Sequence, residues 1–587
     1  MYTSSIHTIL RKVTYMPYTI AREVNQEGNI INVFSDYKKR VPLNSISNSV
    51  SEMDQFLYPH REQVKVMIVL GIGNGEIVKN FINNPSKIIH MIIIEPYSEV
   101  VIGDEIKAML VHANHITVLQ SKDREVPILD FQSILAKFIG VDIELHIHPN
   151  YEKTDLDFLK EVISQLKNGL RILKMNQNTQ QLFQKDWLIE PLLNLKYSYS
   201  LSLFEEFKDK FKGQRGVLVS AGPSASKLIP EIKELQKGAH VFAVGSVMKL
   251  LLKNDITPDF VTSFDSADIN YEAHFKEYSY NGKLIVGSIV NSNILKYHTG
   301  DAILVPESVE GITSKARPDL NTFYSGPSVA VFTLQVMYYL GFSEIYLIGQ
   351  DLALENNQYY ADEAAEGEFV DKNNKNIDLY IDNNAGGKSG TTYPLYSFLQ
   401  SFNQLVKLFD LNKVRVYNLA KYGAKIDHVP YISYEEIKVR TQREEVALNL
   451  NPKVVTSEAL NEISIIVKEL DELHNELRRI KAQLVRFSKN DYISDGKLIE
   501  MLEMLKAIRS MPILEDVILN QISFIVNRIN NVFEFLLDKE QYTNEDKKYI
   551  FIEFFKLIQI IIEHVELIMN DTKFMELRKE LKNEVHS

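Results

Sequence analysis

The chain has 587 residues, with 65 Lys and Arg against 77 Asp and Glu, and a formal net charge of −12. Its hydrophobic fraction of 45% and charged fraction of 24% exclude global disorder. The chain contains no Cys, which excludes disulfides, thiolate metal sites and a Cys nucleophile. The acidic balance argues against nucleic-acid binding. Neither a secretory signal nor an apolar run long enough for a membrane span is visible, so we expect a cytoplasmic protein.

Three regions differ in the pattern of their apolar residues, and we predict domains at residues 1–190, 191–440 and 441–587. In the first two, short β-branched runs alternate with helical stretches, as buried parallel strands do. The predicted strands of the first domain are Val66–Leu70, Ile89–Ile94, Ile116–Leu119 and Ile143–Ile147. Those of the second are Gly216–Ser220, His240–Val244, Phe260–Phe264, Lys283–Val290, Ala302–Val305, Glu344–Ile348 and Val414–Asn418. The predicted fold class is α/β, with two Rossmann-like domains followed by a C-terminal α-helical bundle.

The C-terminal region shows a helical seam. Its apolar residues follow a 3-4 spacing over three heptads, at Ile463, Ile466, Leu470, Leu473, Leu477, Ile480 and Leu484. Thr456 or Ser457 is suited to cap the start of this helix. A later apolar run, Ile550–Met569, follows Thr543 and Asp546 in the spacing of a capping box.

A glycine loop, Leu70-Gly-Ile-Gly-Asn-Gly75, follows the first predicted strand, and Glu95 ends the next. The loop resembles that of S-adenosylmethionine-dependent methyltransferases, although a full G-x-G-x-x-G is missing because Glu76 takes the third position. The alternative is a tight strand-to-helix turn without a ligand, and glycine spacing alone favours that alternative.

Two weaker motifs lead to negative expectations. Asn384–Ser389 ends like a P-loop, but Asp382 stands where the pattern requires Gly and would repel phosphate. His146 and His148 are spaced as metal ligands can be, yet no third ligand of suitable spacing is visible nearby. We therefore expect neither a nucleotide-hydrolysing P-loop nor a metal site.

Four loops at predicted strand ends carry hydroxyl and carboxylate groups in the second domain. Ligands of doubly wound sheets bind outside the carboxyl ends of the strands, so these loops predict a nucleotide-type cleft. The loops are Val219–Ser226, Thr262–Ser266, Ser325–Ser328 and Tyr346–Asp351.

The same segments resemble the motility accessory factor (Maf) flagellin glycosyltransferases. The resemblance is carried by Gly222-Pro-Ser224, Pro258–Asp265, Ser325-Gly-Pro-Ser328, Gly341–Ala353, Thr391-Thr-Tyr393 and Asn418–Ile426. Specific motifs carry the resemblance over residues 216–430. In the flanking regions only the order of domains, a glycine-loop domain before and a helical region after, is similar. The core also resembles bacterial sialyltransferases and the hydroxymethylpterin pyrophosphokinase-like family.

The resemblance implies transfer of a nonulosonic acid (pseudaminic, legionaminic or sialic type) from its CMP derivative to Ser or Thr of flagellin, before export and in support of motility. It implies Asp265 and Asp351 as catalytic carboxylates. The resemblance also implies a set of substrate-binding residues, to which we add Ser246. They are Gly222, Pro223, Ser224, Ser325, Gly326, Ser328, Gly349, Lys388, Thr391, Thr392 and Tyr393.

The sequence departs from the resembled sialyltransferases at one position, where they have a His base and this chain has Lys388. The resemblance therefore does not identify the catalytic base. A Lys is protonated at neutral pH and accepts no proton without strong desolvation. We therefore expect Lys388 to contact an anion. No cofactor is required by the sequence, although a carboxylate-bound Mg²⁺ leaves little trace. One alternative is a pterin pyrophosphokinase using ATP and Mg²⁺. The other is a non-catalytic scaffold in which the helical region 441–587 binds flagellin. The sequence does not predict an oligomeric state.

Overall fold

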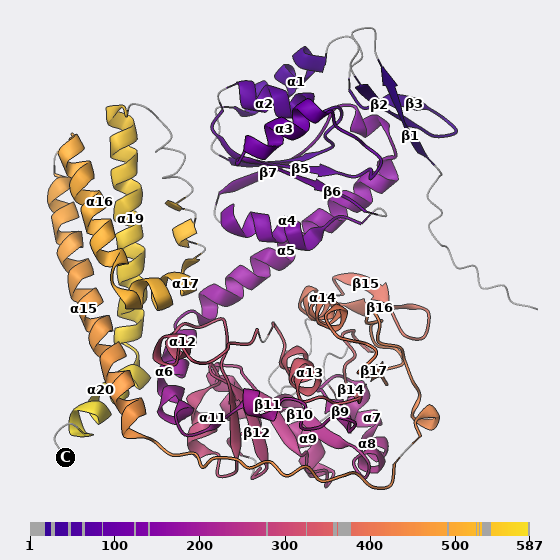
Figure 1. The fold of residues 1–587 in the computed structure, drawn as a ribbon, viewed down its shortest axis with the longest axis vertical. Helices are drawn as coiled ribbons and strands as arrows, with labels where there is room; N and C mark the ends of the chain where they lie inside the picture. The colour runs from indigo at the N-terminus through magenta and orange to yellow at the C-terminus, as the bar shows by residue number, and fades with distance from the viewer. Residues whose placement is uncertain are drawn as a thin grey trace, which may run out of the picture. The chain divides into compact units, whose positions relative to one another are not determined.

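The computed structural model describes residues 18–584 except 25–29, 45–48, 62–64, 85, 123–124, 139–140, 278–279, 325, 356–360, 362–376, 439, 490–491, 524, 528 and 531–541. The chain forms two compact units (Figure 1). The N-terminal unit comprises residues 1–177 with 523–550, and the second unit comprises 178–522 with 551–587. The predicted three-domain boundaries stay a prediction.

The N-terminal unit contains a four-stranded parallel sheet in the order β6-β5-β4-β7. Its strands are β4 (Lys65–Leu70), β5 (Ile88–Glu95), β6 (Ile116–Gln120) and β7 (Asp142–Ile147). All six residues of β4 are buried, because both faces of this central strand are covered. The four strands expected from the sequence are therefore confirmed.

Helices and an antiparallel sheet surround the parallel sheet in the sequence of this unit. The antiparallel strands are β1 (Thr19–Val24), β2 (Ile30–Ser35) and β3 (Arg40–Pro42). The α-helices are α1 (Ser49–Leu57), α2 (Glu76–Asn83), α3 (Asp104–His112), α4 (Ile128–Leu135) and α5 (Leu156–Phe183, which continues into the second unit). The 3₁₀ turns are η1 (Tyr58–His60), η2 (Ala136–Phe138) and η3 (Tyr151–Lys153).

The second unit is built on an eight-stranded parallel sheet in the order β17-β14-β9-β10-β11-β12-β13-β8. Its strands are β8 (Ser202–Leu203), β9 (Arg215–Val219), β10 (His240–Val244), β11 (Phe260–Ser263), β12 (Lys283–Gly287), β13 (Ala302–Val305), β14 (Glu344–Ile348) and β17 (Arg415–Asn418). The seven predicted strands are confirmed, and β8 adds an edge strand that the sequence did not indicate. The strand predicted over Lys283–Val290 ends at Gly287.

Helices connect these strands. They are α6 (Asp186–Ser198), η4 (Phe204–Phe207), α7 (Ser224–Lys227), α8 (Ile229–Leu235), η5 (Gly245–Val247), α9 (Met248–Lys253), α10 (Asp268–His274), α11 (Ser292–Tyr297), α12 (Ile312–Ala316), α13 (Val329–Tyr339), α14 (Tyr393–Lys407) and η7 (Tyr434–Glu436). Helix α13 packs against β9, β10 and β11, and α14 packs against α13. An antiparallel hairpin, β15 (Leu379–Asp382) and β16 (Lys388–Thr391), precedes α14.

The C-terminal region is helical. Its elements are α15 (Ser457–Phe487), α16 (Asp495–Arg509), the π-helical turn η8 (Leu514–Ile518), α17 (Leu519–Gln521), α19 (Asn544–Met569) and α20 (Thr572–Glu584). Figure 1 shows α15 beside α16, which it contacts. All seven seam residues of α15 are buried, and the Thr456 side chain accepts from the Ala459 N–H at 3.2 Å. Thr543 and Asp546 form the predicted capping box, with N–H to side-chain oxygen distances of 2.9 and 3.2 Å.

The predicted fold class is confirmed, since two parallel α/β sheets precede a helical C-terminal region. Among the described helices, none combines the length and the apolarity that a membrane crossing requires.

Candidate functional site

The strand order places a topological switch point between β9 and β14. From β9 the chain builds the sheet outward through β10, β11, β12 and β13, and then returns to pair β14 on the other side of β9. Loops that leave neighbouring strands in opposite directions create a crevice at their carboxyl ends, where ligands of such sheets bind. Here the two loops are 220–224 after β9 and 349–352 after β14.

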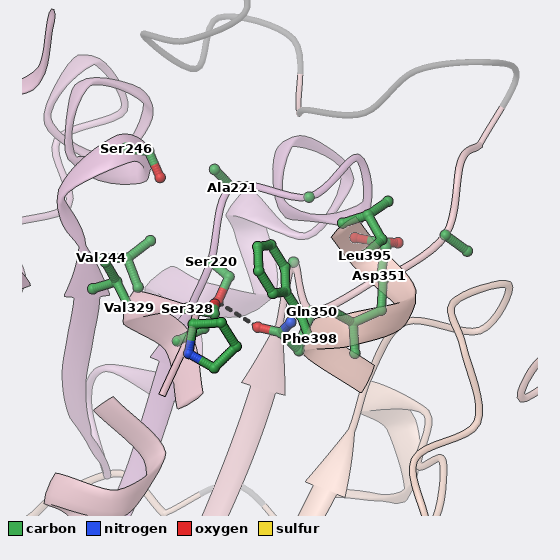
Figure 2. A pocket seen from close by; sticks show the side chains of 16 residues that line it. Ser220, Ala221, Val244, Ser246, Ser328, Val329, Gln350, Asp351, Leu395 and Phe398 are labelled. Atoms are coloured by element: carbon green, nitrogen blue, oxygen red, sulfur yellow. Dashed lines mark hydrogen bonds between the residues drawn. The ribbon is translucent and has the colours of Figure 1, made fainter. Parts of the chain in front are cut away.

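A cavity of about 220 Å³ lies at this switch point. In Figure 2 Ser246 lies on one side of it and Asp351 on the other, with Ser328 between them. The Ser220 hydroxyl donates to Gln350 Oε1 at 2.8 Å, which joins the two loops at the pocket wall. The pocket is lined by Ser220, Ala221, Gly222, Val244, Ser246, Pro327, Ser328, Val329, Ala330, Gly349, Gln350, Asp351, Leu352, Ala353, Leu395 and Phe398.

Asp351 is the buried carboxylate of this pocket. Its Oδ2 accepts the Ser224 main-chain N–H at 3.1 Å and the Ser224 hydroxyl at 2.9 Å. Burial raises the pKa of Asp351 to about 6, although the two bonds from Ser224 favour the charged form and act in the opposite direction. A carboxyl with this pKa is ionised at neutral pH and still accepts a proton readily, as a general base must.

Two glycines let the loops approach each other. A Cβ on Gly222 would lie 2.3 Å from Asp351 Oδ2 and 2.4 Å from the Gly349 carbonyl oxygen. A Cβ on Gly349, whose φ is +70°, would lie 2.0 Å from the Ser220 carbonyl oxygen. Glycine is therefore required at both positions by the close backbone contact that forms the pocket wall.

Backbone strain follows directly after the carboxylate. Leu352 has a φ of 52°, which is unfavourable for a residue with a Cβ and a branched side chain. The strained turn is held by the Ala424 N–H, which donates to the Asp351 carbonyl at 2.7 Å, and by the Thr391 hydroxyl, which donates to the Leu352 carbonyl at 2.9 Å. Such strain is typical of functional sites that fix a side chain in one position.

Six of the sequence-predicted residues belong to or support this pocket. Gly222, Ser246, Ser328, Gly349 and Asp351 line it, and Ser224 bonds to Asp351. Pro223 lies between two of them and precedes the first turn of α7. Gly326, with a φ of +69°, lies in the turn before Pro327. Ser325 lies outside the described residues.

Asp265 does not line this pocket. It follows β11, where its Oδ1 accepts the Ala267 N–H at 3.0 Å. Its carbonyl accepts from the Asn291 N–H at 3.1 Å and from Asn270 Nδ2 at 2.8 Å, which fixes the loop. The structure therefore does not place the two predicted catalytic carboxylates together in one described pocket, and a catalytic role for Asp265 stays a prediction.

The predicted residues between 388 and 393 make structural contacts. Thr391 is fully buried and supports Leu352 as described above. Thr392 caps α14, the helix that brings Leu395 and Phe398 to the pocket. The Tyr393 N–H donates to Asp378 Oδ2 at 3.0 Å. Exposed Lys388 pairs with Asp382 at 2.9 Å across the hairpin, whose antiparallel strands also exclude a P-loop at this turn.

Eleven of the sixteen lining residues are not among the residues predicted from the sequence, and they include the polar Ser220 and Gln350 and the aromatic Phe398. Ser220 and Gln350 lie within the loop segments quoted above, beside the Gly, Pro, Ser and Asp residues that the resemblance implies. Phe398 carries no signal in the sequence, because an apolar residue on an amphipathic helix is indistinguishable from a core residue. Around this pocket, the described residues contain no cluster of three metal-ligating side chains.

The main-chain N–H groups of the N-terminal glycine loop donate to side chains of the same unit. The N–H of Ile72 donates to Glu95 Oε2 and that of Gly73 to Tyr151 Oη, both at 3.0 Å, and the Asn74 N–H donates to Asn44 Oδ1. The Tyr151 hydroxyl in turn donates to Glu95 Oε2 at 2.6 Å. These are the donors that a nucleotide would need, so the geometry favours the turn without a ligand.

Comparisons with known proteins show similarity over part of the second unit and over the whole chain. A family model described as 6-hydroxymethylpterin diphosphokinase MptE-like matches residues 190–357. An uncharacterised protein of Treponema pallidum (strain Nichols) is 27% identical over 108 residues, which are 18% of this chain. The match spans about half the length of that relative (50%).

A solved structure extends the likeness to the whole chain. The Maf glycosyltransferase from Magnetospirillum magneticum AMB-1 superposes with a TM-score of 0.56 at 15% identity, covering 97% of this chain and 96% of that one. The fold is thus that of a two-sheet α/β protein with a helical C-terminal region, similar to the Maf glycosyltransferase. Of the three resemblances expected from the motifs, those to the Maf proteins and to the hydroxymethylpterin kinase-like family are confirmed. The resemblance to bacterial sialyltransferases stays a prediction.

Proposed function

We propose that the protein is a glycosyltransferase that moves a nonulosonic acid from its CMP derivative to Ser or Thr hydroxyls of flagellin, in the cytoplasm before export. The observation that carries the proposal is the pocket between the loops after β9 and β14, which combines hydroxyl groups and a buried carboxylate at the switch point. The whole-chain likeness to the Maf glycosyltransferase supports it.

The reaction needs donors for the leaving group and a base for the acceptor. The acceptor hydroxyl loses its proton as its oxygen bonds to the anomeric carbon, while the bond from that carbon to the phosphate oxygen breaks and CMP leaves with the electron pair. Negative charge grows on the phosphate, so positioned donors lower the barrier. The Gly222 N–H already donates to the Gly349 carbonyl, and we assign the hydroxyls of Ser246 and Ser328, which line the pocket, as donors to the nucleotide.

Asp351 is the base that we assign. It lines the pocket, its carboxylate is fixed by Ser224, and its pKa of about 6 suits proton transfer at neutral pH. Lys388 is exposed and paired with Asp382 on the hairpin, so it takes no part in this assignment. The proposal needs no metal for the proton transfer.

A second candidate function is a pterin pyrophosphokinase, because the family model that matches residues 190–357 covers both pocket loops. That enzyme would transfer diphosphate from ATP to a hydroxymethyl group and would require Mg²⁺ at the phosphates. The full-length structural likeness to a glycosyltransferase favours the first function over the second.

The test is a transfer assay with the purified protein, flagellin and a CMP-nonulosonic acid, read by the intact mass of flagellin. We expect a mass increase of one or more sugar residues, which Asp351→Asn should slow severely. Diphosphate transfer from ATP to a hydroxymethylpterin, without sugar transfer, would support the kinase instead. Flagellin binding without either reaction, unchanged by Asp265→Ala with Asp351→Ala, would support a scaffold.

A further inference from the structure

A second cluster of reactive side chains lies in the N-terminal unit. Strand β7 presents Glu144 and His146, two residues apart and thus on one face, and His60 ends η1 just before β4. The His60 and His146 rings lie 4.3 Å apart between centroids, and Phe56 packs edge-on against both. The three side chains are neither fully buried nor freely exposed, with 21 to 40% of each accessible.

The spacing of the donor atoms matches metal coordination. Glu144 Oε2 lies 3.0 Å from His146 Nε2 and 3.5 Å from His60 Nδ1, and one donor atom from each residue lies within 4.8 Å of the others. Ligands about 2.0–2.1 Å from a tetrahedral zinc ion are about 3.3 Å from one another. A small shift of these side chains therefore brings all three donors to one ion.

A buried positive charge already contacts the cluster. Lys65 begins β4, its side chain is 2% exposed, and its ammonium donates to Glu144 Oε2 and, at 3.0 Å, to His60 Nδ1. An ammonium only donates, so Nδ1 of His60 must hold its lone pair toward the cluster. Two of the three donor atoms are thus oriented toward a cation by the fold itself.

We propose that His60, Glu144 and His146 form a binding site for a divalent transition metal ion of the zinc class, for which the Lys65 ammonium competes. The two-histidine, one-carboxylate set is one that zinc accepts. Binding displaces the ammonium from Glu144 and His60. It also requires Nε2 of His146, now bonded to Glu144, to present a lone pair, so the proton of the neutral ring moves to Nδ1. The ion would join His60 of η1 to Glu144 and His146 of β7.

Zinc titration of the chelator-treated full-length protein tests the site. Calorimetry should detect one ion per chain, and Co²⁺ should give the visible absorption of a tetrahedral site. His60→Ala and His146→Ala should each weaken binding at least about 10-fold. His112→Ala, at an exposed histidine in α3 outside the cluster, is the matched control and should change nothing.

The variant Lys65→Met distinguishes a metal-binding site from a cluster that only forms an internal ion pair with Lys65. Removing the competing ammonium should tighten zinc binding, and the gain should vanish when His146→Ala is added. Zinc binding that survives both histidine substitutions would place the ion elsewhere and overturn the proposal. Failure of the unmodified protein to bind zinc stoichiometrically would also overturn it, because the ammonium would then be the permanent occupant.

Discussion

The carboxylate of Asp351 accepts both the main-chain N–H and the hydroxyl of Ser224, at 3.1 and 2.9 Å. This pair joins the loop after β14 to the loop after β9 at the wall of the pocket. Burial holds the pKa of Asp351 near 6. The contact therefore fixes both the position and the proton affinity of the group that we assign as the base.

Asp351 should set the acidic limb of the pH–rate profile for sugar transfer. The base is active only when ionised, so kcat should rise with pH through about 6. Asp351→Asn should lower kcat by about 10²–10⁴-fold and remove this limb. Ser224→Ala removes a donor to the charged form, so it should raise the pKa of Asp351 and move the limb to higher pH. An unchanged limb in Asp351→Asn would exclude this residue as the base.

Gly349 should tolerate no side chain. Its φ of +70° alone costs an alanine about 1–2 kcal/mol, and the Cβ would also collide with the Ser220 carbonyl oxygen at 2.0 Å. Gly349→Ala should lower the free energy of unfolding by at least that amount. Gly387→Ala is the control, since its Cβ would meet nothing closer than Asn383 at 3.6 Å. Equal stability of the two variants in urea unfolding would refute the close approach.

Tyr151 should stabilise the glycine loop of the N-terminal unit. Tyr151→Phe leaves the Gly73 N–H without its acceptor and removes a donor from Glu95. The expected loss is about 1–3 kcal/mol in the free energy of unfolding. The pKa of Glu95, which burial raises to about 7, should rise further. Tyr58→Phe, at a tyrosine that is 70% exposed, should have little effect.

Lys573 should hold α20 against α6 and α10 within the second unit. Its ammonium lies 2.5 Å from Glu190 Oε1 and 2.7 Å from Asp268 Oδ1, and the Glu190 side chain is only 2% exposed. Lys573→Met removes the ion-pair partner of the buried carboxylate, which then keeps the Ser292 N–H as a donor. Loss of one partner of a buried pair typically costs about 3–5 kcal/mol. Thermal unfolding should show this loss, while Lys579→Met on an exposed position of the same helix should not. Similar unfolding of both variants would contradict the role of the pair.

Much of the fold was predictable because the patterns that mark it are local. The runs that became β4 and β9 are short, β-branched and bounded by turn residues, and the seam of α15 has a helical period. Each pattern reports burial of its own segment, which requires no knowledge of its neighbours. The loops that follow such strands could therefore be selected as candidate site residues.

The remainder depended on contacts between distant segments. His60 lies 84 residues before Glu144, so no spacing rule could join it to the pair of Glu144 and His146 on β7. Thr391 and Lys388 look like phosphate donors in the sequence, but the structure gives them partners in Leu352 and Asp382. The hydroxyl or ammonium of a loop residue shows its chemistry in the sequence, whereas its partner is decided by the tertiary fold.

The most direct test of the proposed donor site is thermal unfolding of the purified protein with CMP, with ATP and Mg²⁺, and with S-adenosylmethionine. CMP at about 100 times its dissociation constant should stabilise the protein by about 2.7 kcal/mol. Ser328→Ala, in the pocket, should weaken this stabilisation. The control variant Ser488→Ala, at the end of α15, should leave it unchanged. S-adenosylmethionine should have no effect, since the glycine-loop donors are bonded internally. Stabilisation by ATP with Mg²⁺ and none by CMP would contradict the proposed transferase.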